Sequence, residues 1–106
     1  AGKPIFVKEE ESLADALTGG IGLDNEHTFD LTKELVDDIV LVSEKEIAEG
    51  ISHAYWHESQ IVEGAGAVAI ASLLNNKFSP KGPSLALLCG RNINIEKHFS
   101  LISARK

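Results

Sequence analysis

A cysteine, a glycine, an arginine and an asparagine stand together at residues 89–92, directly after an apolar run. They offer a thiol, a place for close backbone approach, a guanidinium and an amide. In open α/β sheets, ligands collect beyond the carboxyl ends of strands, so Cys89, Gly90 and Asn92 are candidates for a binding site. The plainer alternative is that Cys89 is a small core residue, Gly90 forms a turn and Asn92 caps the following helix. The spacing alone leaves both interpretations open.

Glu63 and Gly64 begin a second stretch in which chemistry could occur. A carboxylate in the first turn of a helix is stabilised by the helix dipole, which explains Glu63 without any function. A functional role would require Glu63 to face a pocket that it shares with Cys89.

Two histidines, His53 and His57, stand four residues apart on one expected helix face, together with Glu49. This spacing could hold zinc, but the glutamate that follows the first histidine in the metalloprotease motif is missing. We therefore expect a solvated cluster and no metal site. The sequence has no nucleophile elbow and no phosphate loop, and none of its lysines has the desolvated setting expected of a Schiff-base lysine.

Strands and helices must position these residues, and the apolar pattern predicts both. Continuous apolar runs at 39–42 and 84–89 are typical of buried strands, and 4–8 is a shorter extended segment. Helices are expected at 12–17, 28–35, 43–58, 63–74 and 94–102, and Ser43 with Glu46 forms the capping box of the third of these. The order strand, helix, helix, strand, helix predicts an α/β fold, a partial parallel sheet flanked by helices.

Helical spacing also predicts which side chains face the core. In the helix after Ser43 the inward residues are Ile47, Ile51, Ala54 and Tyr55. In the last helix they are Ile95, Phe99 and Ile102.

Composition limits the possible partners and location. The 106 residues are 43% hydrophobic and 25% charged, which is ordinary for a soluble globular protein. The net charge of -6 disfavours a nucleic-acid partner. No apolar run approaches the ~20 residues that span a bilayer, so we expect no membrane partner. The single cysteine cannot form an internal disulfide, and a cytoplasmic location is the default.

Four segments, in this order, resemble the threonine and serine dehydratases of the fold type II (tryptophan synthase β-like) pyridoxal-phosphate enzymes. They are LADALTGGIG, ELVDDIVLVSEKEIAEGI, VEGAGAVAIASLL and LALLCGRNINIEKHFSLI. The resemblance extends over nearly the whole chain and implies that residues 1–106 are the C-terminal segment of the large cofactor-binding domain. The details GGIGL and CGRNI further resemble dehydratases of ectoine or hydroxyectoine utilisation.

The resemblance implies a lyase of amino-acid metabolism that uses pyridoxal 5'-phosphate to eliminate water and ammonia from a hydroxy amino acid. It assigns Cys89 to a contact with the pyridine nitrogen, Glu63 to the same edge of the cofactor, and Gly90 and Asn92 to the turn. A neutral thiol at that nitrogen favours elimination over other fates of the substrate carbanion. Arg91 stands where a second glycine is more usual, and its role stays open.

In this family the Schiff-base lysine, the substrate carboxylate loop and the glycine-rich phosphate cradle lie upstream. The resemblance therefore assigns no catalytic residue to this segment, and we expect it to be inactive alone, whether it is a natural fragment or a truncated piece. The expected partners are the upstream portion of the same enzyme, a further copy in a homo-oligomer, and a small amino-acid substrate. The alternative is a self-contained, non-catalytic α/β regulatory or binding domain.

Overall fold

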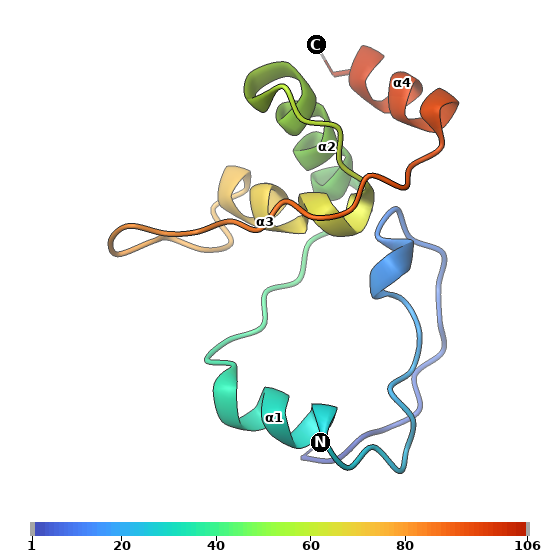
Figure 1. The fold of residues 1–106 in the computed structure, drawn as a ribbon, viewed down its shortest axis with the longest axis vertical. Coiled ribbons are helices and arrows are strands. Elements are labelled where there is room, and N and C mark those ends of the chain that lie inside the picture. The colour runs from blue at the N-terminus through green and yellow to red at the C-terminus, as the bar shows by residue number, and fades with distance from the viewer. Residues whose placement is uncertain (1, 106) are drawn as a thin grey trace.

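All the regular structure in the described residues, 2–105, is helical. The computed structural model contains a short 3-10 helix η1 (Asp15–Leu17) and four α-helices, shown in Figure 1: α1 (Thr28–Leu35), α2 (Glu44–Glu58), α3 (Gly64–Leu74) and α4 (Ile95–Ser103). The expected helix bounds are confirmed to within two residues for these four, and the expected turn at 12–17 is shortened to η1.

The predicted α/β fold is wrong, because residues 2–105 contain no strand and no sheet. The runs 39–42 and 84–89 are not helical, yet neither has a hydrogen-bonded neighbour that would make it a strand. Most of their apolar side chains are exposed, Leu41 by 81% and Leu85 by 88%, whereas Val40 and Val42 are half-buried. A continuous apolar run indicates burial, but pairing requires a second segment at the right distance, which local sequence does not specify.

Helix α2 begins at the predicted capping box. The Ser43 hydroxyl accepts a hydrogen bond from the Glu46 N–H at 3.4 Å, and the Glu46 carboxylate accepts one from the Ser43 N–H at 2.6 Å. Such a cap contributes about 1 kcal/mol to helix stability. Ile47, Ile51 and Ala54 are buried as predicted, so α2 presents one apolar face to the rest of the chain.

Helices α2 and α3 cross with their backbones nearly in contact at Gly50. A methyl group there would lie 2.8 Å from the Ala67 carbonyl oxygen and 3.2 Å from the Ala71 Cβ. Glycine on α2 and alanines on α3 therefore set the separation of the two helices. The core forms around this crossing, from Ala14, Ile47, Ile51, Ala54, Val62, Ala67, Ile70 and Ile102.

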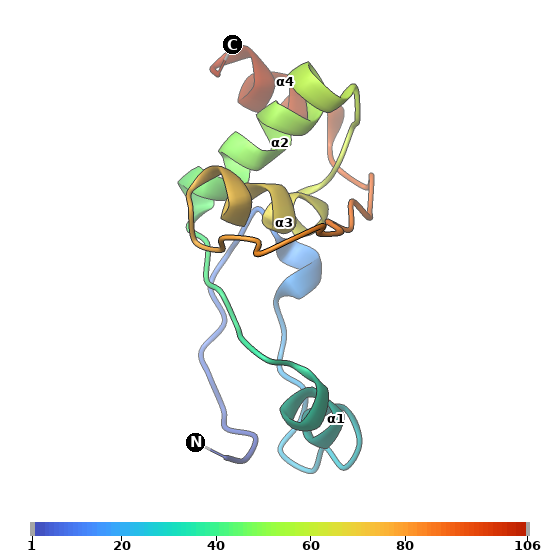
Figure 2. The same cartoon turned by 90° about the vertical axis from the view of Figure 1, so that its left-hand side faces the viewer.

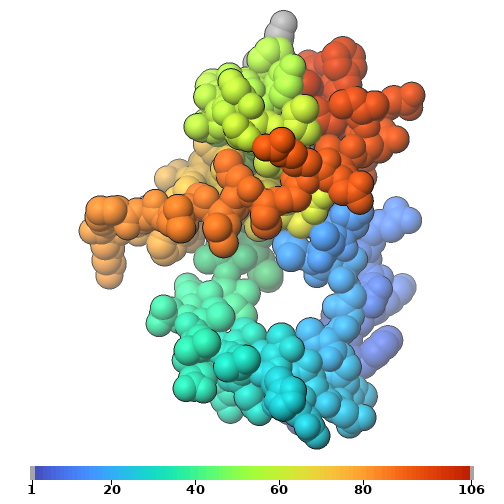
Figure 3. All heavy atoms as spheres, in the orientation of Figure 1, coloured from blue at the N-terminus to red at the C-terminus, as the bar shows by residue number. Residues whose placement is uncertain are grey.

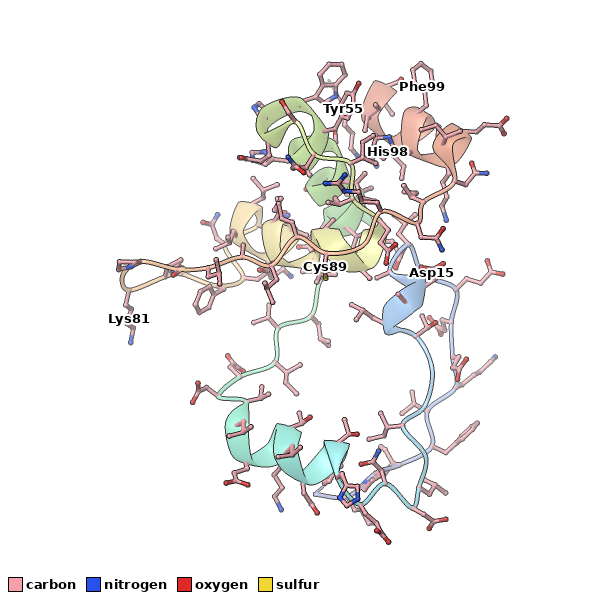
Figure 4. All side chains as sticks on the ribbon, in the orientation of Figure 1. Asp15, Tyr55, Lys81, Cys89, His98 and Phe99 are labelled. Atoms are coloured by element: carbon pink, nitrogen blue, oxygen red, sulfur yellow. The ribbon has the colours of Figure 1, made fainter. Side chains whose placement is uncertain are left out.

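Helix α4 packs on α2 through a different face from the one predicted. Ile102 is buried, but Ile95 and Phe99 are 66% and 68% exposed, and Figure 4 shows Phe99 pointing outward. His98 takes the inward position one turn before Ile102. Apolar spacing favoured the stripe 95–99–102 because a histidine was not counted as a core residue.

The molecule is open in outline. Its radius of gyration is 15.1 Å, against about 13 Å for a compact domain of this length. In Figures 1 and 2 the segment that carries α1 extends away from α2, α3 and α4, and in Figure 1 the loop around residue 80 forms a second projection. Figure 3 shows a gap between the α1 arm and the helical core. Among the described residues, no helix is long and apolar enough to cross a membrane.

His98 is a polar side chain in the α2–α4 interface. It is 2% exposed, its ring meets the Tyr55 ring edge-on with centroids 5.5 Å apart, and within residues 2–105 its Nε2 has no hydrogen-bond partner. Burial away from water disfavours the charged imidazolium and lowers the pKa of His98 below its usual value of 6.5.

We expect the free energy of unfolding to fall as the pH drops below about 6.5. The unfolded chain takes up a proton at His98 in that range, whereas the folded chain resists it until the pH passes its lower pKa. Urea titrations followed by the fluorescence of Trp56, the single tryptophan, measure this change. His98→Leu should flatten the pH dependence, and His27→Leu at an exposed site is the matched control. An unchanged slope in the His98 variant would contradict the assignment.

Candidate functional site

The start of α3 brings three of the predicted site residues into direct contact. The Glu63 N–H donates a hydrogen bond to the Gly90 carbonyl oxygen at 3.1 Å. The Asn92 N–H donates one to the Glu63 carboxylate at 2.8 Å. Cys89 precedes this pair of bonds and lies beside α3 in Figure 4. The residues that the sequence singled out at 63 and at 89–92 thus form one cluster.

Two glycines allow the backbone at residues 89 and 90 to lie against α3. Gly90 has a φ of +80°, a conformation that favours glycine, and a methyl group on it would overlap the Glu63 carboxyl group. A methyl group on Gly66 would overlap the Cys89 carbonyl oxygen. Gly66 was not predicted as a site residue, because nothing in a helical run of small residues identifies which one meets a distant backbone.

Cys89 is exposed and is not part of the core that the described residues form. The Cys89 carbonyl oxygen faces Gly66 of α3, while the residue as a whole is exposed to solvent. Asn92 is not the cap of the last helix either. That cap is Asn94, whose side chain accepts a hydrogen bond from the Lys97 N–H at 2.9 Å.

A second loop reaches the start of α3 at Gly64. A methyl group on Gly64 would overlap the Leu13 carbonyl group. The Glu44 carboxylate holds this loop: it accepts hydrogen bonds from the Ser12 hydroxyl at 2.5 Å and the Leu13 N–H at 2.7 Å. Segments 12–14 and 89–92 therefore both contact the first turn of α3.

An open hollow lies on the side of segment 9–15 and is acidic. The side chains with full charges that line it are those of Glu9, Glu10, Glu11, Asp15, Glu44 and Lys97. Five carboxylates against one ammonium disfavour an anionic ligand such as a phosphate ester. The turn at 89–92 is for that reason the better candidate for a cofactor contact.

Arg91 lies within the turn, but its guanidinium extends toward the loop after α2. Its Nη2 is 3.4 Å from the Gln60 side-chain oxygen. This contact gives Arg91 a neighbour but no assigned chemistry.

The neighbours of His53 and His57 on α2 are not arranged as the ligands of a metal site. The rings of His53 and His57 lie with their centroids 4.5 Å apart and their planes tilted by 30°, and His53 Nε2 lies 3.7 Å from the Glu58 carboxylate. The Glu49 carboxylate instead accepts a hydrogen bond from the Asn75 amide at 3.3 Å. Within the part of the chain that the structure describes, no group of three or more histidine, cysteine, aspartate or glutamate residues could hold a metal ion.

Comparisons with known proteins match nearly the whole chain. The sequence model of a family described as pyridoxal-phosphate dependent enzyme matches residues 1–90. A protein of Sinorhizobium fredii, whose name gives threonine dehydratase as a provisional assignment, is 54% identical over 104 residues. The L-threonine ammonia-lyases of Geobacter sulfurreducens and Thermotoga maritima are each 36% identical, over 105 and 95 residues.

The matches cover far less of the relatives than of this chain. They span 97%, 98% and 89% of the chain, but only 31%, 25% and 23% of the three relatives. The chain therefore spans about a quarter to a third of the length of the relatives it matches. No solved structure gives a significant match.

We expect that the double substitution of His53 and His57 by alanine leaves the metal content unchanged. The reason is that Glu58, whose carboxylate lies 3.7 Å from His53 Nε2, forms no set of three metal ligands with the pair among the described residues. Elemental analysis after dialysis against zinc measures the result, with His27→Ala as the control for an exposed histidine. One equivalent of zinc bound by the wild-type chain and lost in the double variant would contradict this expectation.

Proposed function

We propose that this chain, which belongs to the family of pyridoxal-phosphate-dependent enzymes, is the C-terminal part of a threonine dehydratase. The intact enzyme would eliminate water and ammonia from a hydroxy amino acid. The observation that carries the proposal is the cluster of Glu63 with the turn at 89–92, on a chain whose relatives include named L-threonine ammonia-lyases.

The residues of the turn suit a contact with the edge of a pyridine ring. The Cys89 carbonyl is packed against Gly66, whereas the residue as a whole is exposed, so a ring can approach its sulfur without any change in the backbone. Cys89 would hold the ring nitrogen, while Glu63, Gly90 and Asn92 would fix the position of Cys89.

Bound pyridoxal phosphate supplies the sink for the electrons that leave the α-carbon of an amino acid. Cys89 would limit how strongly the ring withdraws those electrons. A thiol beside the ring nitrogen offers no negative charge to stabilise a proton there, in contrast to a carboxylate. This moderation suits an elimination, which needs less withdrawal of electrons than reactions that hold the substrate carbanion for longer.

The remaining catalytic groups would come from elsewhere in the longer enzyme. The seven lysines that the structure describes are all exposed, which does not suit a lysine bound covalently to the cofactor. We expect the isolated chain to be inactive. The alternative of a self-contained, non-catalytic regulatory or binding domain is disfavoured by the match of 90 residues to an enzyme family.

The finer assignment concerns the substrate and the place of action. The segments GGIGL and CGRNI motivate a substrate derived from ectoine or hydroxyectoine utilisation, beside threonine and serine. A cytoplasmic location belongs to the same proposal. Assays of ammonia release with each amino acid in turn decide the substrate.

The rest of the same enzyme is the partner that we propose for the exposed apolar side chains. Phe6, Leu41 and Leu85 are each more than 80% exposed, which is unusual for an isolated soluble domain. A homo-oligomer of the intact enzyme would bury further surface.

We expect the isolated chain to self-associate and to bind a hydrophobic dye, because its apolar side chains lack cover. Sedimentation and dye fluorescence measure both properties. The double variant Leu85→Lys and Leu87→Lys should reduce them, and Ser79→Lys with Ser84→Lys adds the same charge without removing apolar surface. A compact wild-type monomer that binds no dye would be evidence against the proposal.

We expect Cys89→Ser in the full-length enzyme to retain the cofactor and much of the activity, since a hydroxyl replaces one neutral contact by another. Cys89→Asp should lose roughly tenfold or more, because its charge favours a protonated ring nitrogen. Cofactor content, absorbance spectra and ammonia release from threonine or serine measure the effect. Ser84→Asp, which adds a carboxylate at the far end of the same segment, is the control. Equal activity and spectra in the Ser and Asp variants would rule out this role for Cys89.

A further inference from the structure

We infer that Glu63 is a positioning residue that sets the place of the Cys89 turn, and that it acts through hydrogen bonding rather than through its charge. This inference rests on the proposed function for its catalytic consequence, but its structural part stands on contacts within the chain.

Glu63 holds the turn at two points. Its N–H donates to the Gly90 carbonyl at 3.1 Å, and its carboxylate accepts from the Asn92 N–H at 2.8 Å. The two bonds lie on either side of Arg91, so Glu63 holds the turn against the start of α3 at both Gly90 and Asn92. The backbone bond survives any substitution at 63 except proline, whereas the side-chain bond depends on what stands there.

The carboxylate of Glu63 is not used to cap its own helix. Glu63 occupies the N-cap position of α3, yet its side chain makes no capping hydrogen bond. The N-cap residues of α2 and α4, Ser43 and Asn94, both cap their helices in the ordinary way. A glutamate is also a poor N-cap, because shorter side chains are preferred there. The side chain at 63 has the length needed for a bond to the turn instead.

The backbone of the turn at residues 89–92 has little room to move toward α3 or Glu63. A methyl group on Gly90 would overlap the Glu63 carboxyl group, and one on Gly66 would overlap the Cys89 carbonyl. The turn is therefore pressed against α3 on one side while Cys89 stays exposed on the other. If the Glu63 bond is lost, the backbone of Gly90 and Asn92 can move away from α3, and Cys89 moves with it.

Chain length and charge can be separated by substitution. Glu63→Gln keeps the length and an acceptor oxygen but removes the charge. Glu63→Asp keeps the charge but shortens the side chain by one methylene, and Glu63→Ala removes the acceptor. If positioning is the role, Gln restores function and Asp does not; if the charge acts on the cofactor, the order is reversed.

The experiment uses the full-length enzyme and these three variants, with Glu96→Ala as the control for an exposed glutamate on α4. Hydrogen–deuterium exchange of the peptide spanning residues 89–94 measures whether the Asn92 N–H is still hydrogen-bonded to residue 63, independently of activity. In Glu63→Gln we expect the Asn92 N–H to exchange as slowly as in the wild type. In Glu63→Asp and Glu63→Ala it should exchange at least tenfold faster. In Glu63→Asp and Glu63→Ala, but not in Glu63→Gln, the cofactor spectrum should shift. In the same two variants kcat should fall roughly ten- to a hundredfold with little change in KM.

Two results would overturn the inference: unchanged exchange in Glu63→Ala, or a Gln variant whose spectrum and kcat match those of Ala. Failure of the proposed function has a different signature. A wild-type enzyme that binds no pyridoxal phosphate, or releases no ammonia from any hydroxy amino acid, would remove the catalytic consequence, while the exchange pattern would still decide whether Glu63 holds the turn.

Discussion

The architecture depends on how closely backbone can approach α3. Three glycines make this approach possible: Gly50 of α2 faces Ala67, Gly64 faces Leu13, and Gly66 faces Cys89. Each of them would carry a methyl group into a neighbouring backbone if it were alanine. Because α3 has almost no side-chain bulk on these sides, a helix and two loops from distant parts of the sequence converge on it. Overpacking at such contacts typically costs 1–3 kcal/mol, which makes the small residues a condition of the fold.

Two carboxylates complete this arrangement in the same way. Glu44 at the start of α2 binds the N–H of Leu13, and Glu63 before α3 binds the N–H of Asn92. Both loops lack a ladder of backbone hydrogen bonds, so a side chain supplies the acceptor that a neighbouring strand would otherwise provide. A hydrogen bond to a charged acceptor is stronger than a neutral one, although exposure to water reduces its contribution here.

The sequence predicted the helices well and the strands wrongly, for one physical reason. The start of α2 is encoded locally by Ser43 and Glu46, and the small residues after Glu63 specify a helix with little help from elsewhere. A strand at 39–42 or 84–89 requires a partner that no local pattern names. The face of α4 was wrong because His98 is buried without being apolar. The residues at 63 and 89–92 were singled out from the sequence, but their mutual hydrogen bonds were not.

The turn at residues 89–92 is held by contacts within this chain on one side and is exposed on the other. Glu63, Gly66 and Gly90 fix one side of the Cys89 turn using only groups within residues 63–92. The other side, where Cys89 is exposed, has no such neighbour among the described residues, and the apolar run 85–88 that leads into it is exposed as well. The backbone position of Cys89 is thus set by contacts within the described residues. The exposed face of Cys89 is therefore open to a ligand, and the proposed contact with a cofactor edge would use this face.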